Sequence, residues 1–224
     1  LFEQLERLGE RAALVYDRPD AGPWEFRGRE RVHTFSAVMS WAGCDRLSRI
    51  AHRLRLTDRE QHWREVADGM RDRILERAWN ERRGAFVASF DDDHLDASVL
   101  LLPELGLLPA TDPRFLATLD VIGRELRDGD LLFRYRHEDD FGTPQTAFAT
   151  CAFWYVNALA AAGFVEEARE HFTRLLRYRN GVGLLSEDIA PATGELWGNF
   201  PQTYSLVGVI SSALRLSRPW ETTL

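Results

Sequence analysis

Two glutamates, Glu25 and Glu187, lie in stretches of the chain that are dense in aromatic and charged residues. Glu25 stands between Trp24 and Phe26, and apolar surface around a carboxyl favours its protonated form, although Arg27 acts in the opposite sense. Glu187 is flanked by a serine and an aspartate, which favour an ionised or hydrogen-bonded carboxylate. A carboxylic acid paired with a carboxylate is the requirement for acid–base hydrolysis of a glycosidic bond.

Each of these features also has a simpler interpretation. Glu25 can be a structural residue that pairs with Arg27, and Glu187 can belong to the cap of a helix. Arg134 and Arg136, on either side of Tyr135, offer donors and an aromatic face to a sugar, or they form a salt-bridged surface loop. The residues alone leave both interpretations open.

Other chemistry is poorly supported. The histidines show no spacing typical of zinc ligands, and the chain has no glycine-rich phosphate loop and no G-x-S-x-G nucleophile motif. We therefore expect no metal and no cofactor. Cys44 and Cys151 lie in apolar stretches and are expected to be buried free thiols. Trp41, Trp154 and Tyr155 are expected to pack in the core.

Composition bounds the class of protein. The 224 residues are 45% apolar and carry a net charge of −7, so a globular domain is expected and a nucleic-acid partner is not. No apolar run is long enough for a membrane span, and a cytoplasmic location is expected. The chain begins at Leu1 within a helical pattern, which predicts an N-terminal truncation of one domain that covers residues 1–224.

Hydrophobic periodicity predicts an almost entirely helical chain. Helices are expected at 2–16, 35–55, 59–79, 95–107, 112–127, 145–162, 164–179 and 201–216, with a short extended piece at 84–91. Thr57 and Asp58 are expected to cap the third helix, and Asp112 with Pro113 to open the fifth.

The predicted helices alternate between two kinds. Four are apolar on most faces (35–55, 95–107, 145–162 and 201–216), and the charged, amphipathic helices lie between them. This alternation favours an inner and an outer layer, as in an α/α toroid or a helical solenoid. If every second loop lies on one rim, the loops 22–28, 133–142 and 183–199 meet around one mouth.

Several motifs in order give the chain a family resemblance. They are Gly22-Pro-Trp-Glu-Phe-Arg-Gly, Val38-Met-Ser-Trp-Ala-Gly-Cys-Asp-Arg, Leu95-Asp-Ala-Ser-Val-Leu-Leu-Leu-Pro, Phe133-Arg-Tyr-Arg, Phe148-Ala-Thr-Cys-Ala-Phe-Trp-Tyr-Val, and Gly183-Leu-Leu-Ser-Glu-Asp-Ile through Gly198-Asn-Phe-Pro-Gln-Thr-Tyr-Ser205. The chain resembles glycoside hydrolase family 15, the family of glucoamylases and bacterial trehalases, from about Tyr16 to Trp220.

The resemblance implies an all-α, (α/α)6 toroid, of which this chain is the last eight or so helices. It implies that Glu25 is the general acid and Glu187 the general base of an inverting hydrolase. Trp24, Tyr204 and an arginine of the Arg-Tyr-Arg segment would bind substrate; Arg134 is the nearest match to the family pattern, and Arg136 is the other candidate.

The function implied is hydrolysis of a terminal α-linked glucose from a malto-oligosaccharide, a starch-like glucan or trehalose, without a cofactor. The alternative is a non-catalytic, carbohydrate-binding or scaffold toroid. A toroidal sugar epimerase is a third possibility, but it would need a histidine cluster that the sequence lacks. The expected partner is an oligosaccharide or disaccharide. An incomplete toroid is expected to expose part of its core.

Overall fold

The computed structural model describes residues 1–28 and 30–217, and these residues form two compact units. The first unit comprises Leu1–Asp93 and Glu104–Leu107, and the second comprises His94–Pro103 and the residues from Leu108 onward. That both units form one catalytic domain stays a prediction.

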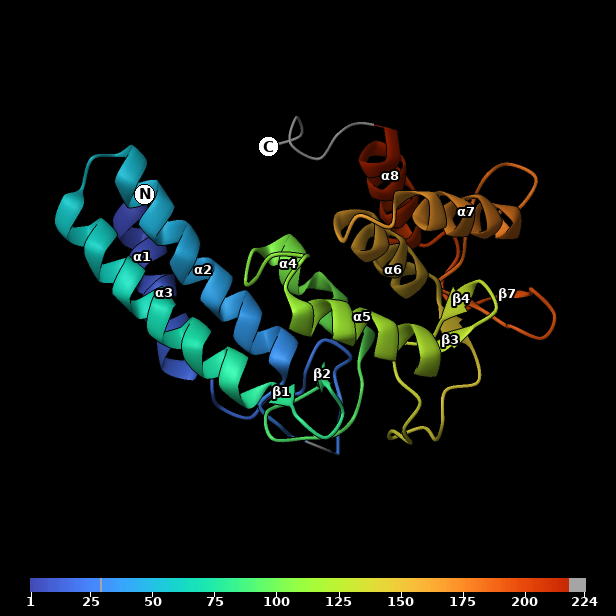
Figure 1. Cartoon of the computed structure of the whole chain (residues 1–224), viewed down its shortest axis with the longest axis horizontal. Helices are drawn as coiled ribbons and strands as arrows, with labels where there is room; N and C mark the ends of the chain where they lie inside the picture. The colour runs from blue at the N-terminus through green and yellow to red at the C-terminus, as the bar shows by residue number, and fades with distance from the viewer. Residues whose placement is uncertain (29, 218–224) are drawn as a thin grey trace. The chain divides into compact units, whose positions relative to one another are not determined.

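Three long helices build the first unit and lie side by side in Figure 1: α1 (Phe2–Val15), α2 (Thr34–Arg53) and α3 (Thr57–Arg77). They approach closely at Gly9, where a Cβ atom would lie 2.2 Å from Leu47 Cδ1 and 2.7 Å from the buried Trp63 ring. The Trp63 indole N–H donates to Glu6 Oε1 at 3.0 Å. A short antiparallel pair follows, β1 (Trp79–Asn80) with β2 (Ala85–Phe86).

The second unit is built around α6 (Ala149–Ala161), which contacts α5, α7, α8 and the 3₁₀ helix η1. Its other helices are η1 (Ala97–Leu101), α5 (Pro113–Glu125), α7 (Val165–Leu175), η2 (Leu176–Tyr178) and α8 (Thr203–Ser217), while the short α4 (Leu102–Leu105) crosses the boundary between the units. The strands form two antiparallel sheets, β3 (Arg127–Asp128) with β4 (Leu131–Leu132), and β5 (Ala147–Phe148), β6 (Asp188–Ile189) and β7 (Leu196–Trp197) in that order.

Two predicted helices differ from the structure. The segment 95–107 is a 3₁₀ turn followed by four residues of α-helix, because Pro103 would lack an N–H and clash in a continuous helix but fits a first turn. The helix expected from residue 145 begins at Ala149, since Ala147 and Phe148 pair with Ile189 and Asp188 instead. The extended piece expected at 84–91 is confirmed only in part, by β2 at Ala85–Phe86.

The predicted caps have different outcomes. Asp112 accepts a hydrogen bond from the Arg114 N–H and Pro113 opens α5, so this cap is confirmed. The cap expected at Thr57 is wrong. Leu56 occupies the N-cap position, no side chain caps the helix, and Thr57 is already its first helical residue.

The helices predicted to be apolar differ in how much of their surface is buried. Most side chains of α6 are buried, as predicted for an inner helix. Helix α8 buries only Ser205, Gly208 and Ser212, and one of its faces leaves Val207, Ile210 and Leu214 exposed by 51%, 58% and 46%. The small residues of α8 face α6, and nothing among the described residues covers its aliphatic face.

The two cysteines are buried and free, as predicted. Burial raises the pKa of the Cys44 thiol to about 11, and burial together with the charge of Asp96 raises that of Cys151. Trp41 and Tyr155 are buried in the core, and Trp154 is half-buried. Among the described residues, no helix has the length and apolar character to cross a membrane.

Candidate active site

The loop that carries Glu25 joins α1 to α2 and is fixed at its base by short-range bonds. Asp20 and Arg31 exchange two backbone hydrogen bonds, of 2.8 and 3.2 Å, so that the loop closes on itself. Asp20 Oδ1 also accepts from the Gly22 N–H at 2.5 Å and from the Ser36 hydroxyl of α2 at 2.9 Å. Beyond the loop, the Thr34 N–H donates to Ala88 O, which anchors the start of α2. These bonds hold the two ends of the loop together and tie its start to α2.

Glu25 lies at the tip of this loop in a conformation that non-glycine residues rarely adopt, with φ of +57°. The Glu25 N–H donates to Gly22 O and the Phe26 N–H to Ala21 O, which defines a tight turn. The Glu25 side chain is exposed, Trp24 beside it is half-buried, and the Phe26 ring stacks on His33 with 5.6 Å between centroids. Such backbone strain costs about 1–2 kcal/mol and is concentrated at functional sites.

The simpler interpretation of Glu25, as half of an ion pair with Arg27, gains no support. Among the described residues, no ion pair or side-chain hydrogen bond engages the Glu25 carboxyl. The turn presents this carboxyl outward.

Glu187 immediately precedes β6, the central strand of the three-stranded sheet, where Asp188 pairs with Phe148 on one side and Trp197 on the other. The backbone of Glu187 is bonded on both sides, because its N–H donates to Asn199 O and its carbonyl accepts from the Ala149 N–H, each at 2.9 Å. Its position is thus set by two other segments of the second unit, residues 148–149 on one side and 197–199 on the other. The alternative of a helix cap is wrong, since Glu187 lies beside a strand and no helix begins there.

Three N–H groups converge on the half-buried Glu187 side chain. The backbone N–H and the side-chain Nδ2 of Asn199 donate to Oε2, both at 3.1 Å, and Gln202 Nε2 donates to Oε1 at 3.2 Å. Gly198 makes room for this arrangement, since a Cβ atom there would lie 2.8 Å from Oε2. The carboxylate is held as an acceptor on both oxygens.

Asn199 and Gln202 were not predicted as site residues. Both lie in the Gly198–Ser205 motif, so the motif itself was a signal that a role could be sought there.

Asp188, the residue next to Glu187, interacts with Arg134, which in turn pairs with Asp139. Asp188 Oδ2 accepts from the Thr146 hydroxyl at 2.9 Å, and burial raises the pKa of the Asp188 carboxyl while Thr146 and the charge of Arg134 oppose that rise. The Tyr135 hydroxyl donates to Asp139 Oδ2 at 2.7 Å. Although burial acts to raise it, the pKa of Asp139 is lowered by this bond, by the Phe141 N–H and by Arg134.

The structure separates the two candidate arginines. Arg134 is half-buried, lies 3.5 Å from Asp139 Oδ2 and interacts electrostatically with Asp188, the residue next to Glu187. Arg136 is exposed, stacks 3.9 Å from the Phe133 ring centroid and donates to Arg127 O. Only the first of them is coupled to the surroundings of Glu187.

Tyr204 lies in the first turn of α8 with 67% of its surface exposed. Its N–H donates to Gln202 Oε1 at 3.4 Å, and its carbonyl accepts from the Thr150 hydroxyl at 3.4 Å. Tyr204 is thus two residues from Gln202, which bonds Glu187, and its exposed ring is available to a ligand.

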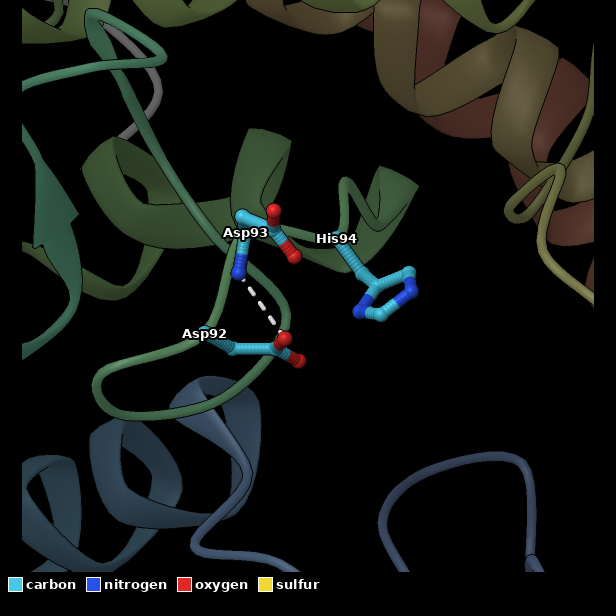
Figure 2. A group of neighbouring side chains, drawn as sticks. All are labelled: Asp92, Asp93 and His94. Carbon is cyan, nitrogen blue, oxygen red and sulfur yellow. Dashed lines mark hydrogen bonds between the residues drawn. The ribbon is translucent and has the colours of Figure 1, made fainter.

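A grouping of potential metal ligands, Asp92, Asp93 and His94, is drawn in Figure 2. The three residues are consecutive, and the Asp93 N–H donates to Asp92 Oδ1 at 2.8 Å. Asp92 also accepts from the Ser89 hydroxyl and pairs with Arg31 at 3.3 Å. Since protein groups already engage Asp92, we assign no ion to this segment.

Of the predicted site residues, Trp24 and Glu25 therefore belong to the first unit, and Arg134, Arg136, Glu187 and Tyr204 to the second. Within the second unit, Arg134, Glu187 and Tyr204 are linked through Asp188 and Gln202.

Known proteins resemble the chain over most of its length. It is 37% identical over 224 residues to a trehalase of Mycobacterium tuberculosis, covering 99% of this chain and 33% of that protein. It is 35% identical over 217 residues to a trehalase of Thermoplasma volcanium, covering 96% of this chain and 35% of that protein. The chain thus spans about a third of the length of these relatives.

Solved structures show the same fold. A bacterial glucoamylase complexed with acarbose superposes with a TM-score of 0.77 at 16% identity, covering 96% of this chain and 38% of that one. A family 15 glucoamylase from Hypocrea jecorina gives 0.72 at 14% identity, covering 93% and 45%. These neighbours confirm the expected all-α toroid class.

The sequence model described as glycosyl hydrolases family 15 matches residues 12–214. Because that match covers nearly the whole chain and the relatives and solved structures agree with it, the chain belongs to glycosyl hydrolases family 15.

Proposed function

We propose that this chain carries the acid and the base of an inverting glycoside hydrolase whose substrate is trehalose, with Glu25 as the acid and Glu187 as the base. The similarity to trehalases supports trehalose over the malto-oligosaccharides and glucans that the family resemblance also allows. The proposal concerns the activity of a whole protein. The trehalases that this chain resembles are about three times as long as the chain.

The observation that carries the proposal is the contrast between the two carboxyl groups. Glu25 is exposed on a strained turn. Glu187 is half-buried, and three N–H donors hold its oxygens. The three donors fix the direction from which Glu187 can accept a proton, whereas the Glu25 carboxyl, which no side-chain hydrogen bond engages among the described residues, is open to a substrate oxygen.

Hydrolysis proceeds in a single displacement. Glu25 gives its proton to the glycosidic oxygen as the bond from that oxygen to the anomeric carbon breaks. A water oxygen bonds to the opposite face of the anomeric carbon, and Glu187 takes the proton that this water releases. The two carboxyl groups must then lie about 6.5–9.5 Å apart to leave room for the water.

The other predicted residues bind the sugar in this proposal. Trp24 borders the ring at the point of cleavage, Tyr204 offers an exposed aromatic face, and Arg134 donates to sugar hydroxyls. We favour Arg134 over Arg136 because its charge reaches the residue beside Glu187, whereas Arg136 is occupied with Phe133 and Arg127.

Stereochemistry tests the mechanism. Inversion at one anomeric carbon of trehalose releases one β-glucose and one α-glucose, which proton NMR resolves in the first minutes before mutarotation. Release of α-glucose alone would rule out inversion. Turnover of maltose but not trehalose would refute the substrate.

Substitution tests the two roles. Glu25→Gln and Glu187→Gln are each expected to lower kcat on trehalose by about 10²–10⁴-fold, the usual contribution of a general acid or base. Glu195→Gln, an exposed residue of the hairpin that follows Glu187, is the matched control and is expected to keep full activity. Undiminished activity in either test variant would remove that glutamate from the mechanism, and sugar binding without turnover in the unmodified protein would favour the non-catalytic alternative.

A further inference from the structure

The Glu187 carboxylate lies between two backbone segments that are bonded to each other. The Gln202 N–H donates to Leu185 O at 3.0 Å, and the Ser205 hydroxyl donates to Ser186 O at 2.7 Å. Together with the bond from the Glu187 N–H to Asn199 O, these contacts fix the two segments without any help from the Glu187 side chain. The side chains of Asn199 and Gln202 are therefore not needed to keep the segments together.

The orientation of the Gln202 amide is determined by its second contact. Its Oε1 accepts from the Tyr204 N–H, so its NH₂ group is the end that faces Glu187. The reversed amide would place its oxygen against the Glu187 carboxylate and its NH₂ group against the Tyr204 N–H, so that neither contact could be a hydrogen bond. Gln202 is therefore a defined donor to Glu187 Oε1.

The hydrogen bonds leave one side of the carboxylate available. A carboxylate has about four acceptor positions, two on each oxygen. Among the described residues, Oε2 accepts two N–H groups and Oε1 accepts one. The remaining position is on Oε1, and its direction is set because the other three are occupied.

We propose that Asn199 and Gln202 are positioning residues that hold the Glu187 carboxylate so that the remaining acceptor position on Oε1 receives the proton of the attacking water. This inference rests on the proposed role of Glu187 as the base. It adds which oxygen acts and which side chains aim it.

Both side chains can be changed without opening the core, because Asn199 is exposed and Gln202 is half-buried. We expect Gln202→Leu and Asn199→Ala, made in the full chain, to lower kcat on trehalose by about 10- to 100-fold, the effect of a misplacement of up to an ångström. KM is expected to stay within about threefold, since the sugar contacts remain. Circular dichroism and thermal unfolding verify that the variants fold.

Gln61→Leu is the matched control. Gln61 is an exposed glutamine of α3 that also donates to a glutamate, with Nε2 2.9 Å from Glu65 Oε1, but it lies outside the site. It is expected to keep kcat and KM unchanged.

A double-mutant comparison separates aiming the base from other effects on turnover. In a Glu187→Ala background there is no carboxylate to hold, so Gln202→Leu is expected to lower the residual rate by less than twofold. α-Glucosyl fluoride, whose leaving group needs no proton donor, keeps that residual rate measurable. The same fold loss in both backgrounds, a loss confined to KM, or an unchanged kcat in both single variants would overturn the proposal.

These outcomes are distinct from failure of the proposed function. If Glu187→Ala itself keeps full activity, Glu187 is not the base and the positioning role falls with it. If Glu187→Ala is inactive while Gln202→Leu and Asn199→Ala are fully active, the base stands and only the positioning role is lost.

Discussion

Substituting Gly198 by alanine is the sharpest test of how the backbone places Glu187. The added Cβ would lie 2.8 Å from Oε2 and 3.1 Å from the Cβ of Glu187, where ordinary contact begins at 3.4 Å. The carboxylate must therefore retreat by about 0.6 Å. Because Oε2 already lies 3.1 Å from both nitrogens of Asn199, that retreat breaks or lengthens the two bonds beyond useful range.

The expected magnitude follows from that displacement. A shift of 1 Å costs about 100-fold in rate, so 0.6 Å corresponds to roughly 10- to 30-fold in kcat. Alanine at a φ of +77° adds strain of about 1–2 kcal/mol, which lowers Tm by about 2–8 °C in a protein of this size. Steady-state kinetics on trehalose and thermal unfolding measure the two effects separately.

Gly183→Ala distinguishes the contact from the strain. Gly183 has a similar φ of +85°, but a Cβ atom there would meet nothing within 4 Å. We expect a comparable loss of Tm and a kcat within twofold of the parent. Equal losses of kcat in the two variants, or an unchanged kcat in Gly198→Ala despite a lowered Tm, would refute the close-contact argument.

Two further predictions concern stability in the second unit. Gly208→Ala on α8 would place a Cβ atom 2.7–2.8 Å from the buried Phe153 of α6. We expect this overpacking to lower the free energy of unfolding by about 1–3 kcal/mol, measured as a lower midpoint in urea unfolding. An unchanged midpoint would show that α8 can move away from α6 at no cost. Arg127 Nη1 donates to Nε2 of the buried His171 at 3.0 Å, so this ring nitrogen carries no proton. Burial, and then the charges of Arg174 and Arg127, lower the pKa of His171. Since the unfolded chain then binds the proton more readily, stability is lost as pH falls below about 6.5. Thermal unfolding from pH 7.5 to 5 is expected to show a shallower decline for His171→Gln than for the parent, and parallel declines would contradict this assignment.

Elements with a strong local pattern were predictable from the sequence. The amphipathic spacing of α1 and the charged face of α3 are local properties, and both helices lie within two residues of their predicted ends. The Asp112-Pro113 start of α5 is likewise a contact between near neighbours. Such features depend on residues a few positions apart, so the sequence alone indicates them.

Features that depend on distant pairing were not predictable in the same way. The start of α6 is displaced because Ala147 and Phe148 pair with a strand some 40 residues later, which periodicity cannot reveal. Asn199 and Gln202 lie 12 and 15 residues from Glu187. The hairpin of β6 and β7, which separates them from Glu187 in the sequence, brings their N–H groups onto its carboxylate. The aliphatic face of α8 has the pattern of a buried helix, and its exposure depends on which elements are present to cover it.

The unequal anchoring of the two glutamates has a consequence for conformational entropy. Fixing a glutamate side chain costs about 1.5–2 kcal/mol in lost rotamer freedom. For Glu187 that loss accompanies folding, since three N–H groups already restrict it. The exposed Glu25 side chain is not restricted in this way among the described residues, and in the proposed mechanism it loses its rotamer freedom only when a substrate oxygen engages it. If the proposal holds, a sugar that lacks a leaving-group oxygen leaves the rotamer freedom of Glu25 unchanged, so the affinity for glucose alone would not report on the role of Glu25.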